Sequence, residues 1–153
     1  VVFGAANIPH PAKSTKGGED AFFFDDAAGA FGVADGVGGS ASDSVDPGLF
    51  SREVMRRCHA ALTDADTLSQ ALEAAGSHPL DLGGSTTVLL GQLDSGSGVL
   101  RIINLGDSGA IVMRPSFRQF AQGKFLWPRR VLRSLDAQHY FNCPYQACKE
   151  DFE

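Results

Sequence analysis

Two helical patterns stand side by side in the middle of the chain, with short apolar runs before and after them, and this order constrains the fold most. Five apolar runs have the length of single strands and are separated by groups of glycine: residues 21–24, 31–34, 86–93, 99–105 and 110–113. Because the helices are grouped and do not alternate with the strands, the order disfavours parallel βαβ units. The sequence therefore predicts an α+β fold with an antiparallel sheet, in which residues 94–98 join two strands as a hairpin.

The two helices are predicted over residues 47–62 and 67–75, where apolar side chains recur at helical spacing. Asp46 is expected to cap the first helix, because an aspartate carboxylate accepts hydrogen bonds from the free N–H groups of the first turn. Asp66 is expected to cap the second helix in the same way. The aromatic residues of the first apolar run are expected to be buried in the sheet: Phe22, Phe23 and Phe24.

Composition narrows the classes of function. A length of 153 residues suits one domain with its own core. The formal net charge of −5 argues against a nucleic-acid partner, whose phosphates favour basic proteins. No apolar run reaches the length of about 18 residues that a membrane-spanning helix needs. Three cysteines without a Cys-x-x-Cys pair predict neither a disulfide framework nor a thiolate zinc site, which favours an intracellular location.

One segment departs from the acidic average: residues 114–133 hold six basic residues, and no acid lies between Asp107 and Asp136. The six are Arg114, Arg118, Lys124, Arg129, Arg130 and Arg133. Either the segment is an exposed loop whose charges are simply solvated, or it is a docking surface for an acidic or phosphorylated partner. Aromatic residues among the bases resemble a nucleic-acid surface, but no nucleic-acid-binding motif surrounds them, so this interpretation is not adopted.

Acidic residues stand where predicted strands begin or end. Glu19 and Asp20 precede the first strand. Asp35 leaves the second strand and is followed by Gly36, and Asp107 lies between the last two strands. Each site alone is explained by turn chemistry, since Asp-Gly and Gly-Asp are common turn dipeptides. Together the sites suit Mg²⁺ or Mn²⁺, which prefer oxygen ligands and need few carboxylates beside a backbone carbonyl.

Four motifs follow one another along the chain: Glu19-Asp20, then residues 32–39 (Gly-Val-Ala-Asp-Gly-Val-Gly-Gly), 84–87 (Gly-Ser-Thr-Thr) and 104–109 (Asn-Leu-Gly-Asp-Ser-Gly). This series resembles the N-terminal motifs of the metal-dependent protein phosphatases, the type-2C serine/threonine (PPM) family. Further stretches resemble its organelle-targeted branch: residues 9–13, 17–21, 45–51 and 139–146. The resemblance implies an α-β-β-α sandwich. Residues 1–153 would form its N-terminal portion, an incomplete sandwich of antiparallel sheets flanked by helices, with an inserted basic loop at about 114–133.

For the site, the resemblance implies a metal-dependent protein serine/threonine phosphatase with two or more Mg²⁺ or Mn²⁺ ions and a phosphoprotein substrate. Asp35 would bridge two ions, and the Gly36 carbonyl would bind one of them. Glu19 and Asp20 would support the ions through metal-bound water, and Asp107 would help to hold a further ion. A metal-activated water would then attack the phosphorus of phosphoserine or phosphothreonine, with Asp35, Glu19 and Asp20 as the catalytic carboxylates.

Departures from the family pattern raise an alternative. Lys13 and Lys16 stand where an arginine usually binds the substrate phosphate, and lysine lacks the bidentate geometry of arginine. Nothing after residue 146 resembles the family's later Asp-Gly and Asp-Asn motifs, whose aspartates complete the first metal site. The alternative is therefore a catalytically incomplete, phosphatase-like binding module. The resemblance to the organelle-targeted branch alone suggests a mitochondrial or plastid location.

Overall fold

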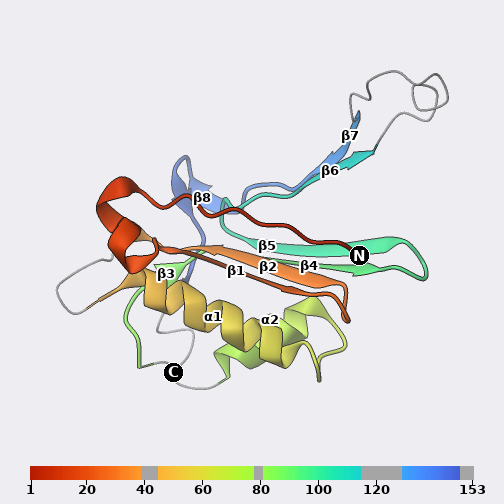
Figure 1. Cartoon of the computed structure of the whole chain (residues 1–153), viewed down its shortest axis with the longest axis horizontal. Helices are drawn as coiled ribbons and strands as arrows, with labels where there is room; N and C mark the ends of the chain where they lie inside the picture. The colour runs from red at the N-terminus through yellow and green to blue at the C-terminus, as the bar shows by residue number, and fades with distance from the viewer. Residues whose placement is uncertain (39–44, 78–80, 115–128, 149–153) are drawn as a thin grey trace.

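The structure is a computed structural model that describes residues 1–38, 45–77, 81–114 and 129–148 (Figure 1). At its centre lies a four-stranded antiparallel sheet with the order β1-β2-β4-β5. Its strands are β1 (Asp20–Asp25), β2 (Ala30–Asp35), β4 (Val88–Asp94) and β5 (Val99–Leu105). Two helices, α1 (Pro47–Ala61) and α2 (Leu68–Gly76), cover one face of this sheet, as Figure 1 shows. The predicted α+β class is confirmed, with one sheet layer and one helical layer of the predicted sandwich.

A 3₁₀ helix and three short strand pairs surround the central sheet. The 3₁₀ helix η1 (Pro11–Lys16) precedes β1. The pairs are β3 (Ser85–Thr86) with β10 (Ala147–Cys148), β6 (Ile111–Arg114) with β7 (Arg129–Arg133), and β8 (Gln138–Tyr140) with β9 (Cys143–Pro144). The prediction of a single strand over 86–93 is wrong, because the chain divides at Thr87 into two strands. The strand before Thr87, β3, pairs with β10, and the strand after it, β4, belongs to the central sheet. The predicted hairpin over 94–98 is confirmed by the antiparallel pairing of β4 with β5.

The core forms between the helical layer and the central sheet. Phe50, Val54 and Cys58 lie at helical spacing on the inner face of α1 and are fully buried. Val88 and Leu90 alternate along β4, contribute to the same cluster from the sheet, and are also fully buried. Burial raises the pKa of the Cys58 thiol to about 12, so the group stays protonated and packs as a small apolar side chain.

Both helices begin at a capping side chain. The Asp46 carboxylate accepts a hydrogen bond of 3.0 Å from the Gly48 N–H, as the sequence predicts. The prediction for α2 is wrong by one residue, because its cap is Thr67 rather than Asp66. Thr67 forms a capping box, in which its hydroxyl accepts from the Gln70 N–H at 3.2 Å and the Gln70 side chain accepts from the Thr67 N–H at 3.0 Å. Of the helices in the described ranges, none combines the length and the apolarity needed to cross a membrane.

The expectation that all three phenylalanines of β1 are buried is wrong. Side chains alternate between the two faces of a strand, and only Phe23 packs toward α1, where its ring stacks on His59 with centroids 4.8 Å apart. Phe22 and Phe24 lie on the other face and are 44% and 41% exposed. The N-terminal segment covers part of that face, since the Phe3 ring stacks on Phe24 with centroids 5.5 Å apart.

The basic segment 114–133 has strand structure at both ends. Arg114 ends β6, and residues 129–133 form β7, which pairs with β6 in antiparallel fashion. Residues 115–128, to which the predicted loop insertion mainly refers, lie outside the described residues. Arg133 is exposed, and its guanidinium lies 3.7 Å from a carboxylate oxygen of Asp136.

The fully buried position of Leu90 predicts a large loss of stability on truncation. Leu90→Ala should lower the free energy of unfolding by about 2–5 kcal/mol, because it removes buried methyl groups and leaves a cavity. Leu49→Ala in α1, at a residue that is 49% exposed, is the matched control and should cost less than about 1 kcal/mol. Urea unfolding followed by circular dichroism measures both losses. Equal losses for the two variants would contradict the assigned core.

Candidate functional site

The antiparallel register of β1 and β2 brings two of the predicted acidic residues together. Asp20, the first residue of β1, pairs with Asp35, the last residue of β2. Directly opposed residues of an antiparallel pair have Cα atoms about 5 Å apart. The Asp20 carboxyl lies near enough to the Asp35 carboxyl to disfavour its ionisation.

The Asp35 carboxyl is the centre of a wider acidic cluster, made of Glu19, Asp20, Asp35 and Asp107. Burial, followed by the charge and hydrogen bond of Asp20, raises the pKa of Asp35 to about 6, with smaller contributions from the charges of Asp107 and Glu19. The three other acidic residues predicted from the sequence thus all act on the charge of Asp35. Because like charges at short range repel, a bound cation would relieve the repulsion and would compete with protons for Asp35.

Glu19 is held by both its side chain and its backbone. Its carboxylate forms an ion pair with the ammonium group of Lys13 from η1. Its carbonyl oxygen accepts hydrogen bonds from the Ser51 hydroxyl at 2.5 Å and from the Gly36 N–H at 3.2 Å. These bonds tie the segment before β1 to the helix α1 and to the end of β2, and so fix the backbone on which Glu19 and Asp20 stand.

Two glycines after Asp35 allow the chain segments of the cluster to approach closely. A Cβ atom on Gly36 would lie 2.5 Å from the Glu19 carbonyl oxygen. A Cβ atom on Gly38 would lie 2.6 Å from Lys13 Nζ and 2.9 Å from a carboxylate oxygen of Glu19. A larger residue at Gly36 would therefore push apart the segments that carry Glu19 and Asp35.

The donor chemistry of the acidic cluster fits a hard divalent cation, since every candidate side-chain ligand is a carboxylate. In the part of the chain that the structure describes, no three His, Cys, Asp or Glu side chains are arranged so that they could hold one metal ion. The Lys13 ammonium neutralises part of the charge of the cluster through its ion pair with Glu19. The ligand roles assigned from the sequence stay predictions for Asp35, Gly36, Glu19, Asp20 and Asp107.

Two threonines to which the sequence assigns no role lie against Asp35. Thr86 Oγ1 donates to the Asp35 carbonyl at 2.9 Å, and Thr87 Oγ1 accepts from the Asp35 N–H at 3.1 Å. Ser108, which follows Asp107, shares a hydrogen bond of 2.6 Å with Thr87. The signal that could have found them is a run of three hydroxyl residues, Ser85 to Thr87, between a glycine pair and an apolar run.

The two lysines predicted to bind phosphate both have acidic partners. Lys13 pairs with Glu19 and therefore neutralises charge inside the acidic cluster. Lys16 Nζ lies 3.8 Å from a carboxylate oxygen of Asp46, and 74% of the Lys16 side chain is exposed. The phosphate-binding role of both lysines stays a prediction.

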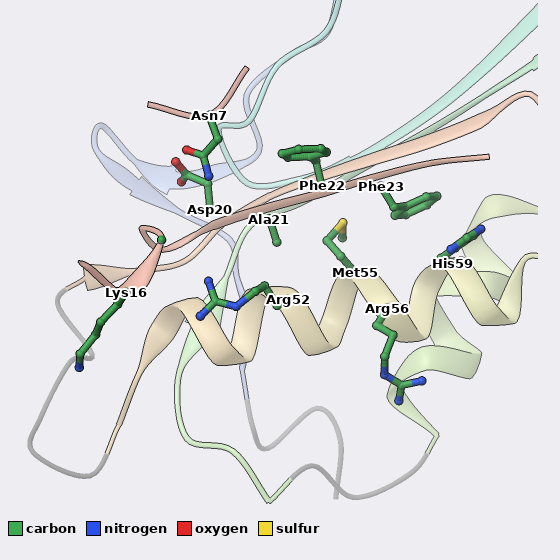
Figure 2. Close-up of a pocket in the computed structure, with 11 residues that line it drawn as sticks. Asn7, Lys16, Asp20, Ala21, Phe22, Phe23, Arg52, Met55, Arg56 and His59 are labelled. Carbon is green, nitrogen blue, oxygen red and sulfur yellow. The ribbon is translucent and has the colours of Figure 1, made fainter. Parts of the chain in front are cut away.

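A cavity of about 700 Å³ opens beside Asp20, between β1 and α1 (Figure 2). The basic side chains that α1 contributes to its wall all have partners within the protein: Arg52 with the Gly18 carbonyl, Arg56 with Glu53, and His59 with Asp25. These three side chains are thus already engaged within the protein, and we assign the cavity no ligand of its own.

Known proteins of similar sequence are named as protein phosphatases. The rice (Oryza sativa subsp. japonica) "Probable protein phosphatase 2C 1" is 37% identical over 153 residues, which cover 98% of this chain and 42% of the relative. The Arabidopsis thaliana "Probable protein phosphatase 2C 26" is 36% identical over 96% of this chain and 46% of the relative. No family model matches the chain.

A solved structure agrees in both fold and sequence. The X-ray structure of the photosystem II phosphatase PBCP superposes with a TM-score of 0.73 at 35% identity, over 92% of this chain and 52% of that one. This chain belongs to the type-2C protein phosphatase family. Type-2C phosphatases are generally metal-dependent, which agrees with the carboxylate chemistry of the acidic cluster. The chain spans less than half the length of the two curated type-2C relatives named above.

Asp35→Asn tests the electrostatics of this type-2C acidic cluster. Because the pKa of Asp35 is raised from 3.8 to about 6 in the folded protein, ionisation of Asp35 destabilises the fold when no metal is bound. The penalty is complete above about pH 6, shrinks as the pH falls through that value, and vanishes below 3.8. Asp35→Asn should therefore raise the Tm in metal-free buffer by about 2–4 °C near pH 7.5 and give no gain near pH 4.

Asp94→Asn is the matched control for this measurement. Hydrogen bonds from the Ser97 hydroxyl and from nearby backbone N–H groups lower the pKa of Asp94, so its ionised form stabilises the fold. The control substitution should accordingly lower the Tm near pH 7.5. Differential scanning calorimetry with a chelator present measures both variants. A Tm for Asp35→Asn at or below wild type near pH 7.5 would show that the clustered carboxylates do not repel one another.

Proposed function

We propose that this chain supplies the metal-binding part of a protein serine/threonine phosphatase that hydrolyses phosphoserine and phosphothreonine in protein substrates. The observation that carries the proposal is the convergence of Asp20, Asp107 and Glu19 on the Asp35 carboxyl, whose pKa they raise together with burial. The relatives named protein phosphatase 2C support the same assignment. The proposed cofactor is Mg²⁺ or Mn²⁺, in two or more ions, because the available ligands are hard oxygen donors.

The proposed roles follow from the placement of each residue. Asp35 and the Gly36 carbonyl would bind the cations directly. Asp20 and Glu19 would support them through metal-bound water, and Asp107 would help to bind a further ion. When bound, the cations supply a nucleophile from water at neutral pH and stabilise negative charge on the phosphoryl oxygens. The chain's own contribution is to hold the carboxylates together beforehand, through the β1–β2 register and the hydrogen bonds to the Glu19 backbone. Cation binding should weaken below about pH 6, because protons then compete for Asp35.

Lys13 acts in this proposal as an exchangeable counter-ion. Its ammonium neutralises Glu19 in the metal-free protein. With a divalent cation bound beside Glu19, the Lys13 ammonium would no longer be needed to neutralise this carboxylate. Lys13 would then be released to bind the phosphate of the substrate, the role that the sequence predicts for it and for Lys16.

The alternative, a catalytically incomplete binding module, has less support. The relatives are named as phosphatases, and all four acidic residues of the cluster are present, with Asp20, Asp107 and Glu19 each raising the pKa of Asp35. Docking of an acidic partner on residues 114–133 and a mitochondrial or plastid location stay predictions from the sequence.

Metal-dependent hydrolysis separates the enzyme from the module. We expect the chain, once extended to the length of a whole type-2C phosphatase, to hydrolyse p-nitrophenyl phosphate only with Mg²⁺ or Mn²⁺. The 153-residue chain alone should be much slower. Asp35→Ala should lower kcat/KM of the extended protein by at least about 100-fold, since loss of a group that merely supports a metal ligand already costs about 10–100-fold.

Asp26→Ala is the matched control for this assay. Asp26 is exposed in the turn that follows β1, outside the acidic cluster, so its removal should leave the activity unchanged. An extended protein that binds a phosphoprotein but hydrolyses nothing with either ion would establish the binding module instead.

A further inference from the structure

Two consecutive threonines hold the backbone of one acidic residue. Thr86 Oγ1 donates to the Asp35 carbonyl at 2.9 Å, and the Thr87 N–H donates to the same carbonyl at 3.0 Å. Thr87 Oγ1 in turn accepts from the Asp35 N–H at 3.1 Å. The regular pairing of β2 with β4 ends before this point, at Val33 opposite Leu89. Hydrogen bonds from the two threonines therefore hold the end of β2 at Asp35, beyond the last regular pair with β4.

Thr87 also contacts the loop that carries Asp107. Its hydroxyl shares a hydrogen bond of 2.6 Å with Ser108 Oγ. Gly106, at a φ of +108°, packs so closely on Thr87 that a Cβ atom there would lie 2.7 Å from Thr87 Cγ2. The residues immediately before and after Asp107 thus both rest on Thr87, the same residue that holds the Asp35 backbone.

The burial of the threonines shows that their hydroxyl groups serve these contacts. Thr86 is 0% exposed and Thr87 is 2% exposed. Valine has nearly the shape of threonine, and a buried hydroxyl costs free energy unless it is hydrogen-bonded. The Thr87 hydroxyl finds its partners on Asp35 and Ser108, which connects the two segments that bring carboxylates to the acidic cluster.

We infer that Thr87 and Ser108 are positioning residues that set the placement of the Asp35 and Asp107 carboxylates relative to each other, and through it the affinity of the acidic cluster for a divalent cation. The inference rests on the proposed function, because it assumes that the cluster binds the cation. Neither hydroxyl has to touch the ion, since Thr87 holds the Asp35 backbone and Ser108, next to Asp107, is bonded to Thr87. Groups one step removed from a metal commonly change its affinity by about 10–100-fold.

Mn²⁺ binding to the 153-residue chain, measured by electron paramagnetic resonance of the free ion, tests this without requiring catalysis. Thr87→Val keeps the shape of the side chain, removes the hydroxyl, and should weaken binding by about 10-fold. Thr87→Ser keeps the hydroxyl and should bind within about twofold of wild type. Ser108→Ala should also weaken binding, but no more than Thr87→Val, which additionally loses the hydrogen bond from the Asp35 N–H. The double variant should bind no more weakly than Thr87→Val alone, because Thr87→Val already removes the bond that Ser108→Ala would break.

Thr67→Val makes the same chemical change at the cap of α2, outside the acidic cluster. It should leave Mn²⁺ affinity unchanged although it removes a hydrogen bond from the fold. Wild-type affinity in Thr87→Val would overturn the inference and leave the proposed function intact. A wild-type chain that binds no Mn²⁺ would overturn the proposed metal site and the inference with it. If Thr87→Val does not fold, Ser108→Ala at its partly exposed position carries the same test.

Discussion

The register of one strand pair governs the rest of this structure. Pairing Asp20 with Asp35 places two carboxylates side by side at the end of the sheet, an arrangement that costs free energy unless a proton or a cation lies between them. A slip of one residue would send the side chains of one strand to the opposite face of the sheet. The core prevents such a slip, because Ala21 and Ala34 are buried against the helical layer. Packing on one face of the sheet therefore fixes the acidic cluster at its end.

Much of the fold follows from local patterns, and the failures occur where distant segments compete. The grouped helices and the glycine-rich turn predict the antiparallel sheet correctly, because both depend on residues close in sequence. The apolar run 86–93 looks continuous, yet β3 pairs with β10 from the far end of the chain, so the strand divides at Thr87. Phe22 and Phe24 are apolar and look like core residues, yet both are exposed. Which face of a strand is covered depends on the element that packs against it, and the strand's own sequence does not specify this.

The candidate site can be predicted from the sequence as a set of residues but not as an arrangement. Acids beside glycines at strand ends are visible in the chain, and the family resemblance puts them in order. That Asp107 approaches Asp35 depends on the hydrogen bond between Thr87 and Ser108, which joins segments far apart in sequence. The neutralisation of Glu19 by Lys13 depends likewise on how η1 folds back on the start of β1. Contacts of this kind join segments that only the tertiary fold brings together, so short motifs do not specify them.

Paramagnetic broadening of backbone amide NMR signals by Mn²⁺ tests the cation site most directly, because the effect falls steeply with distance from the bound ion. We expect substoichiometric Mn²⁺ to broaden first the amides of Asp20, Asp35 and Asp107. Those of Asp26, in the turn after β1, and of Asp94, at the end of β4, should stay sharp. Broadening centred on Asp26 or Asp94, or no selective broadening at all, would contradict the claim that the β1–β2 register builds a site for a divalent cation.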